Sequence, residues 1–487
     1  MARDYDFSVD GLCYRINDDG ATVSVSSCSK NIAGEVVIPE RVNHDGKEYV
    51  VRMVDIKAFY DCKYLRSIII PNTIIEIGSL AFYRCTSLTN IIIPSSVTKI
   101  RTMAFYKCLG LNSIIIPDSV TEIGRGSFKR CNNLASVVIS KNIKEISCSA
   151  FYGCMSLEFV IIPRSVTKIS ESAFAGCKSI NSIEIPKSVT EICSNAFSGC
   201  GNMLSIVLPS SVTKIANYTF SHSGIVSISI PDTVTEIGIG AFKCCENLKS
   251  VTIPDSVTKI CKKAFELCTS IEGIVLPNSL KEINESTFFK CEKMNWISLP
   301  DSLISIGHSA FAGVNLNYVS LPNTLKSINW SAFGGCHLTS LVIPDSITYI
   351  CFEAFNGICG EFGVDELIVP SSSNDLVKRT LYNENKYFLS NIYGHVGFAG
   401  QNDTFEHYLE VCNSFNEQPS LTKRNNYGIS LQERYFQDGD KVKKGQKLYL
   451  IEPDEYALEA KNARANVNQT TAVYQNSEVD LKRATEL

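Results

Sequence analysis

The sequence predicts an α/β repeat solenoid, rich in strands, with a parallel sheet on one face. Three observations predict this fold. Phenylalanine recurs at steps of 22 or 23 residues, proline recurs with the same period, and apolar residues alternate just before each proline. A fixed period of this length is typical of stacked repeat units, and each unit here reads roughly L-x-x-I-x-I-P-x-S-V-T-x-I-x-x-x-A-F-x-x-C.

The repeat phenylalanines divide residues 55–370 into about fourteen coils. They are Phe59, Phe82, Phe105, Phe128, Phe151, Phe174, Phe197, Phe220, Phe242, Phe265, Phe288, Phe311, Phe333 and Phe355. The residues one and three positions before each proline are apolar in every coil, including the coil in which Ser140 replaces proline. A strand this short cannot bury its apolar side alone. We therefore expect the coils to stack their strands into one parallel sheet. The segment S-V-T-x-I supplies a second inward pair, and A-F-x-x-C closes the coil with a turn.

The residues before and after the repeats form other segments. Residues 1–54 read as an N-terminal β cap and a degenerate first repeat, with hairpins at the turn Asn17–Gly20 and at Asp45–Lys47. Such a cap would cover the exposed end of the solenoid. Residues 371–426 are polar and aperiodic, which predicts a C-terminal cap and linker.

Composition excludes several classes of function. The net charge is −4, with both signs interspersed, so we expect no nucleic-acid partner. No window reaches the run of about eighteen apolar residues that a spanning helix needs, so no transmembrane segment is expected. The first residues, Met1-Ala-Arg-Asp-Tyr-Asp, are followed by no apolar stretch, so the sequence shows no secretory signal peptide.

Most cysteines recur with the period of the repeat, and their spacing does not indicate a catalytic or metal-binding site. Eleven of the twenty cysteines stand three residues after a repeat phenylalanine. Neighbouring coils would place their Cβ atoms about 4.8 Å apart, whereas a disulfide prefers about 3.8 Å, so buried free thiols are favoured over disulfides. The six histidines show neither the spacing of metal ligands nor that of a base paired with a nucleophile. We therefore expect no catalytic residue, no metal site, no cofactor and no enzymatic activity.

The outward strand positions are the candidate binding face. Two residues before the proline, five consecutive coils carry apolar side chains; four residues before it, three aromatic residues interrupt a row dominated by serine. β-branched residues suit a sheet, and another segment could cover them. The alternative is that this face binds a protein or glycan partner. The candidate residues are Ile69, Ile92, Ile115, Val138, Phe159, Ile161, Trp296 and Tyr318.

Charge alternates five residues after the proline. The positions from Glu76 to Glu282 change sign between coils in eight of nine neighbouring pairs. Stacking places these side chains next to one another, where each exposed pair contributes on the order of 0.5 kcal/mol. We interpret the pattern as control of solubility and register.

The period, the register and the A-F-x-x-C box resemble the BspA-like leucine-rich repeats of bacterial and protist surface proteins. This resemblance implies a cell-surface or extracellular location and adhesion to host proteins, matrix proteins or other cells.

The C-terminal residues, 427–487, differ from the repeats. The sequence from Gln437 to Pro453 resembles the half-motif of biotinyl/lipoyl-like domains in HlyD-type membrane fusion (periplasmic adaptor) proteins. A heptad pattern from Tyr456 to Ala484 then predicts a long coiled-coil helix. The resemblance implies a periplasmic location and an envelope-transport partner in efflux or type I secretion. No modification motif surrounds a lysine, so lipoylation and biotinylation are not expected.

Three functions are compatible with these features. The first is a non-catalytic interaction and adhesion protein that presents its sheet face to a protein or glycan. The second is a transport-adaptor component in which the C-terminal segment matters. The third is an intracellular scaffold, favoured by the free thiols and the absence of a visible signal peptide.

Overall fold

The computed structural model describes residues 5–26, 29–338, 340–351 and 353–355, and the backbone of strands at 366–368, 431–434 and 449–451. The chain divides into two compact units, Met1–Asn413 and Ser414–Leu487. In the second unit the described residues are β33 (Leu431–Arg434) and β34 (Tyr449–Ile451), which pair antiparallel. The helix expected from Tyr456 to Ala484, the linker at 371–426 and most of the lipoyl-like segment lie outside the described residues.

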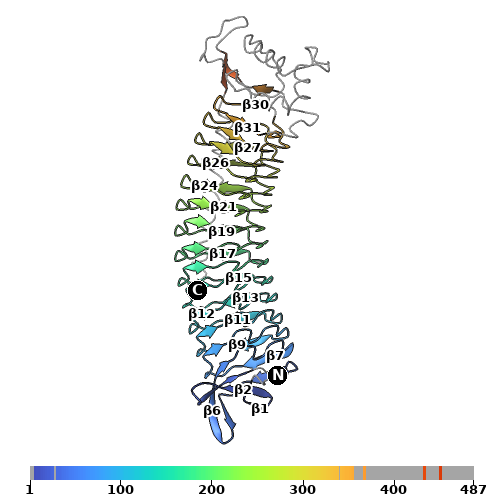
Figure 1. Ribbon diagram of the computed structural model, residues 1–487, viewed down its shortest axis with the longest axis vertical. Coiled ribbons are helices and arrows are strands. Elements are labelled where there is room, and N and C mark those ends of the chain that lie inside the picture. Colours follow the sequence, from blue (N-terminus) through green and yellow to red (C-terminus); the bar gives the residue numbers. More distant parts are fainter. Residues whose placement is uncertain are drawn as a thin grey trace, which may run out of the picture. The chain divides into compact units, whose positions relative to one another are not determined.

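The first unit is a β-solenoid whose coils contribute short parallel strands to two ladders (Figure 1). The first ladder contains the strands before each proline: β4 (Ala33–Val37), β7 (Tyr64–Ile69), β9 (Asn90–Ile92), β11 (Ser113–Ile115), β13 (Ser136–Val138), β15 (Phe159–Val160), β17 (Ser182–Glu184), β19 (Ser205–Val207), β21 (Ser227–Ser229), β23 (Ser250–Thr252), β25 (Gly273–Val275), β27 (Trp296–Ser298), β30 (Ser340–Val342) and β32 (Glu366–Ile368).

The second ladder contains the strands after each proline: β6 (Lys47–Val54), β8 (Glu76–Ile77), β10 (Lys99–Ile100), β12 (Glu122–Ile123), β14 (Glu145–Ile146), β16 (Lys168–Ile169), β18 (Glu191–Ile192), β20 (Lys214–Ile215), β22 (Glu236–Ile237), β24 (Lys259–Ile260), β26 (Glu282–Ile283), β28 (Ser305–Ile306), β29 (Ser327–Ile328) and β31 (Tyr349–Ile350). The prediction of one parallel sheet was therefore incomplete. The segment after the proline also pairs with its neighbours, for example Lys99 with Glu76 and Glu122.

The α/β part of the predicted class is wrong for the described residues, which form strands and turns without a helix. The physical reason lies in the A-F-x-x-C corner. In each coil the residue two positions before the phenylalanine adopts a left-handed backbone, as at Met103 (φ 54°), and the residue two positions after it does so in thirteen coils, as at Lys107 (φ 56°). Because L-residues form no continuous helix through such positions, the corner consists of successive tight turns. Alternate N–H groups in it donate to the next coil, as Phe105 does to Ser127 (2.7 Å).

The core is a single stack of the repeat phenylalanines. Consecutive rings lie 5.2–6.0 Å apart between centroids, with interplanar angles of 2–18°. All fourteen side chains are buried. Leucine, isoleucine and valine from both ladders surround the stack, so each coil contributes one layer to a continuous apolar core.

A cysteine stands three residues after eleven of the fourteen phenylalanines, and these cysteines form a second internal row. In ten coils the cysteine Sγ donates to the carbonyl oxygen of the phenylalanine in the preceding coil, at 3.0–3.4 Å. The register cysteines are free thiols, as the strand spacing predicted. Their role is therefore packing together with a weak S–H···O bond that joins adjacent coils.

Hydroxyl groups after the proline connect the coils on the outside of the turn. Ser119 donates to the carbonyl of Val97 (2.7 Å), and Ser188 donates to that of Val166 (2.7 Å). Where Ser140 replaces proline, its own hydroxyl donates to Val120 (2.6 Å). These turn hydroxyls thus satisfy backbone carbonyls of the preceding coil.

The N-terminal cap continues the second ladder. β1 (Phe7–Val9), β2 (Leu12–Ile16) and β3 (Thr22–Val25) form an antiparallel meander, and β5 (Arg41–His44) forms a hairpin with β6. Both expected hairpin turns are present. β3 pairs in parallel with β6, which pairs with β8, so the cap covers the free edge of the first coil. An ion pair between Arg15 and the buried Asp55 (2.7 Å) strengthens this junction.

A test of the stack is Phe174→Ala, which removes one ring between two neighbours. We expect the free energy of unfolding to fall by about 3–5 kcal/mol, because the cavity cannot close between rigid coils. Phe159→Ala is the matched control: its ring is exposed on the sheet face, so the loss should stay below about 0.5 kcal/mol. Urea denaturation followed by circular dichroism measures both. Equal losses in the two variants would contradict the stack as the main source of stability.

The thiol row predicts low reactivity. Burial raises the pKa of Cys131 to about 12 and that of Cys200 to about 12. Because only the thiolate reacts, alkylation by iodoacetamide near pH 8 should leave both residues unmodified until the protein unfolds. Cys148, which is half-buried and outside the row, should be labelled before Cys131 and Cys200. Peptide mapping by mass spectrometry reads the order, and early labelling of Cys131 in the folded protein would contradict the buried row.

Candidate functional site

Most strands of the first ladder are only two or three residues long. Side by side they expose a regular face. In β11 the middle residue, Ile114, points into the core, while Ser113 and Ile115 on either side point outward. The same pattern holds in β13, β17 and β19. These coils therefore present two outward side chains each, two and four residues before the proline.

The residue two positions before the proline is apolar and exposed in six consecutive coils. These residues, which we call the apolar stripe, are Val37, Ile69, Ile92, Ile115, Val138 and Ile161. Ile92 and Ile161 are 81% and 82% exposed. The structure adds Val37, because β4 in the degenerate first repeat pairs in register with β7 and places Val37 opposite Ile69. Six strands at about 4.8 Å spacing give a stripe roughly 24 Å long.

The three aromatic candidates occupy the neighbouring row, four residues before the proline, and do not all lie together. Phe159 is in the same coil as Ile161, at the end of the stripe, and is exposed. Trp296 and Tyr318 are in two adjacent coils further along, six ladder steps from β15 to β27, which is roughly 29 Å. The eight predicted residues thus form two groups on one face.

The indole of Trp296 packs onto the neighbouring strand. A Cβ atom added to its register partner Gly273 would lie 1.9 Å from Cε2 of the indole, so glycine is required beneath the ring. This contact explains why glycine replaces serine at that position. It also leaves Trp296 only 36% exposed.

Comparison with known proteins places this repeat in a family. The family described as the BspA-type leucine-rich repeat region matches the chain in six copies, over residues 52–181, 167–295 and 281–392. The chain belongs to the BspA-type leucine-rich repeat family. The matched residues end at 392, so the resemblance of the C-terminal segment to HlyD-type proteins, with its envelope-transport partner, gains no support.

Solved structures of leucine-rich repeat proteins are similar to this chain. A leucine-rich repeat protein from Bacteroides ovatus is 26% identical, with a TM-score of 0.61, and the match covers 72% of this chain and 92% of that one. A leucine-rich cell surface protein from Faecalibacterium prausnitzii is 29% identical, with a TM-score of 0.49, covering 74% and 94%. No curated protein matches the chain.

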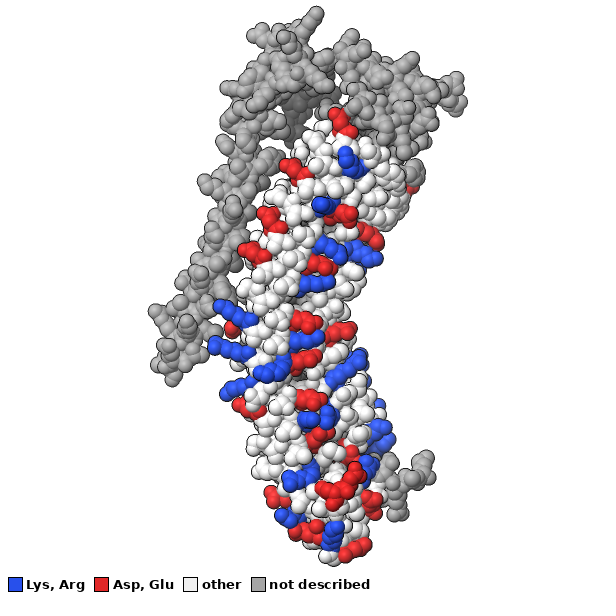
Figure 2. Space-filling view, turned by 60° about the vertical axis from the view of Figure 1, so that its left-hand side comes forward, with Lys and Arg blue, Asp and Glu red and all other residues white. Residues whose placement is uncertain are grey.

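The second ladder of this BspA-type solenoid carries the alternating charges (Figure 2). The predicted neighbours do lie side by side, and ion pairs join Lys168 to Glu191 (3.0 Å) and Glu236 to both Lys214 (3.1 Å) and Lys259 (3.5 Å). The hydrogen bond from Lys168 lowers the pKa of Glu191. The structure confirms that the charged positions are neighbours, and their control of register and solubility stays an interpretation.

Arg101 is a charged contact that the repeat pattern did not indicate. Its guanidinium binds Glu76 of the preceding coil through two nitrogens (2.7 and 3.1 Å) and Glu122 of the following coil through one (3.3 Å). Both flanking coils carry glycine at the position of Arg101, namely Gly78 and Gly124. Arg101 therefore joins three coils, whereas Lys99 in the expected register forms no ion pair within the described residues.

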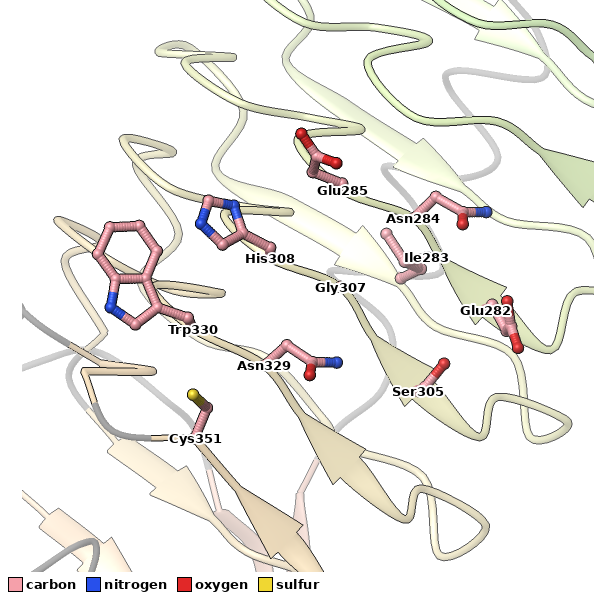
Figure 3. A pocket seen from close by; sticks show the side chains of 10 residues that line it. All are labelled: Glu282, Ile283, Asn284, Glu285, Ser305, Gly307, His308, Asn329, Trp330 and Cys351. Carbon is pink, nitrogen blue, oxygen red and sulfur yellow. The ribbon is translucent and has the colours of Figure 1, made fainter.

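A groove with a volume of about 380 Å³ lies between the second ladder and the corner near the C-terminal coils (Figure 3). The ring of His308 stacks on Trp330 on one side (4.6 Å between centroids), and Glu282 and Ser305 line the other. Its floor includes Asn329, whose Nδ2 donates to the carbonyl of Ile306 (2.9 Å). The Asn329 amide is thus occupied by a hydrogen bond to the backbone.

The described residues offer this groove no catalytic or metal-binding arrangement. His308 forms no hydrogen bond with Ser305 or Cys351 there, so no nucleophile is paired with a base. Across the described part of the chain no three His, Cys, Asp or Glu residues converge on a possible metal position. Within the same residues, no helix has the length and apolar character needed to cross a bilayer.

The role of Arg101 can be tested by Arg101→Met. Loss of the three-coil contact should lower the free energy of unfolding by about 1 kcal/mol at low salt and by less at high salt, because the guanidinium is partly exposed. Lys99→Met, in the same coil, should cost less than about 0.3 kcal/mol. Urea denaturation at two salt concentrations measures both variants. A larger cost for Lys99→Met would show that the predicted register, and not Arg101, carries the electrostatic contribution.

Proposed function

We propose that this BspA-type protein is a non-catalytic interaction protein that binds a protein partner through the apolar stripe, in the manner of a surface adhesin. The observation that carries the proposal is the continuous exposure of six β-branched side chains on consecutive coils. An apolar surface of this length on a folded protein is typical of an interaction site.

The surroundings of the stripe favour a protein over a glycan. The parallel row contains Ser67, Asn90, Ser113 and Ser136, which are polar and border the apolar side chains. An apolar centre with a polar rim is the usual anatomy of a protein–protein interface. A glycan would need several convergent hydrogen-bonding groups, which Val and Ile do not supply.

Phe159 is the proposed anchor of this interface. Its exposed ring stands next to Ile161, at the end of the stripe, and aromatic side chains dominate binding energy at such sites. Trp296 and Tyr318 form a separate, smaller group. Because Trp296 rests on Gly273, its indole is held in place before any partner binds, which lowers the entropic cost of contact.

The proposal is tested with the triple variant Ile92→Ser, Ile115→Ser and Ile161→Ser, assayed by biolayer interferometry against immobilised fibronectin, fibrinogen and laminin. We expect the wild-type protein to bind at least one of them and the variant to lose at least about tenfold in affinity, or about 1.4 kcal/mol.

The matched control is Val207→Ser, Val275→Ser and Val342→Ser, which removes three exposed apolar side chains outside the stripe. Its affinity should remain within about twofold of wild type. An unchanged affinity in the stripe variant, with circular dichroism showing an intact fold, would refute the assignment of the binding surface. Absence of wild-type binding to all three proteins would count against adhesion to matrix proteins.

A further inference from the structure

The corner segments of four consecutive coils contain basic and aromatic residues but no acid. Residues 78–87, 101–110, 124–133 and 147–156 include no aspartate or glutamate, whereas the flanking coils contribute Asp61 and Glu171 at the same corner. We call the side chains one and two positions after the repeat phenylalanine in these coils the basic corner: Arg84, Lys107, Lys129 and Arg130, with Tyr83, Tyr106 and Tyr152. The small net charge of the whole chain conceals this local excess.

The backbone sets the spacing of these cations. Arg84, Lys107 and Arg130 occupy the same corner position in successive coils, each with a left-handed backbone (φ 60°, 56° and 61°). The N–H of Arg84 donates to the carbonyl of Tyr106 (2.7 Å), and that of Lys107 donates to Lys129 (2.9 Å). The backbones that carry the cations therefore follow one another at the coil spacing of about 4.8 Å.

These cations are almost free of acidic partners. Arg84 lies 3.4 Å from Asp61, while Lys107, Lys129 and Arg130 form no ion pair within the described residues. Two of them contact tyrosine rings instead: Lys129 Nζ lies 4.4 Å from the Tyr152 centroid, and Lys107 Nζ lies 5.6 Å from that of Tyr106. Such contacts hold the ammonium groups at the corner without neutralising them.

Stacked tyrosines lie beside the cations of the basic corner, and Tyr83 has a tyrosine ring on each of its faces. Tyr60, Tyr83 and Tyr106 are stacked on one another, with centroids 4.8 and 4.7 Å apart and interplanar angles of 2° and 7°. Burial and the neighbouring tyrosines raise the pKa of Tyr83, so its hydroxyl keeps its proton. The stacked edges thus form a row of hydrogen-bond donors beside the row of cations.

We infer that the basic corner binds a linear sulfated polysaccharide along the axis of the solenoid. Such a polymer carries regularly spaced anionic groups and hydroxyls, which match a row of cations beside a row of donors. Single-stranded nucleic acid fits less well, because its bases need free aromatic faces to stack on, and Tyr83 has neighbouring tyrosines on both faces. The basic corner is separate from the apolar stripe, so the inference does not rest on the proposed protein partner.

The test measures binding of a heparin dodecasaccharide to the full chain by isothermal titration calorimetry, with desulfated heparin and oligodeoxythymidine as comparison ligands. We expect the wild-type protein to bind the sulfated oligosaccharide and not the desulfated one, with affinity falling about tenfold or more between roughly 50 and roughly 200 mM salt. Lys107→Glu with Arg130→Glu should weaken binding by at least about tenfold.

Lys187→Glu with Lys249→Glu is the matched control, because it makes the same change in net charge at exposed lysines outside the corner. It should bind within about twofold of wild type. Lys129→Glu, at a position without a left-handed backbone, repeats the test should the double variant fail to fold, and a loss of about fivefold is expected.

Three results would overturn the inference. One is absence of wild-type binding to the sulfated oligosaccharide. The second is an equal loss in the control variant, which would show that net charge alone attracts the ligand. The third is binding of oligodeoxythymidine as tight as that of heparin, which would assign the corner to nucleic acid.

Discussion

The stacking of one phenylalanine ring on the next is the interaction on which the rest of this structure depends. Centroid distances of 5.2–6.0 Å exceed the strand spacing of about 4.8 Å only slightly, so offset rings and paired backbones fit the same rise per coil. A coil with a few extra residues inside this path would separate its ring from the stack. The constant period of 22 or 23 residues is the consequence.

Constant coil length turns each position of the repeat into a row along the molecule. Inward rows hold phenylalanine, cysteine and β-branched residues, and they vary little because each side chain packs against its equivalents. Outward rows have no such restriction. The apolar stripe, the alternating charges and the basic corner consist of outward rows in which neighbouring coils carry related side chains. Small sequence changes repeated along a row therefore produce an extended surface.

Much of this organisation could be predicted from the sequence, because the repeat period shows which residues occupy equivalent positions in successive coils. The inward and outward positions around Ile92 and Ile115, the cap hairpins and the free thiols follow from period and alternation alone. Two ladders could not be distinguished from one, since a two-residue strand such as Lys99–Ile100 has no periodicity of its own.

Contacts between different repeat positions of adjacent coils also could not be predicted from the repeat pattern. Arg101 reaches Glu76 from a different row, and Gly273 makes room for an indole that is 23 residues later in the chain. The left-handed residues of the corner include Lys107 and Arg130, which have no special preference for that conformation. There the stacked neighbours, and not local propensity, determine the backbone.

The central claim is that contacts between equivalent residues of adjacent coils stabilise this fold. The most direct test is the stability of a protein that lacks one whole coil, from Pro186 to Leu208. Joining Ile185 to Pro209 preserves every row, so the account predicts cooperative thermal unfolding within about 5 °C of the intact protein. Deletion of Pro186 to Ala196 alone, which breaks the rows, should abolish the transition. Loss of cooperative unfolding in the whole-coil deletion would contradict the account, because it would show that particular long-range contacts are required.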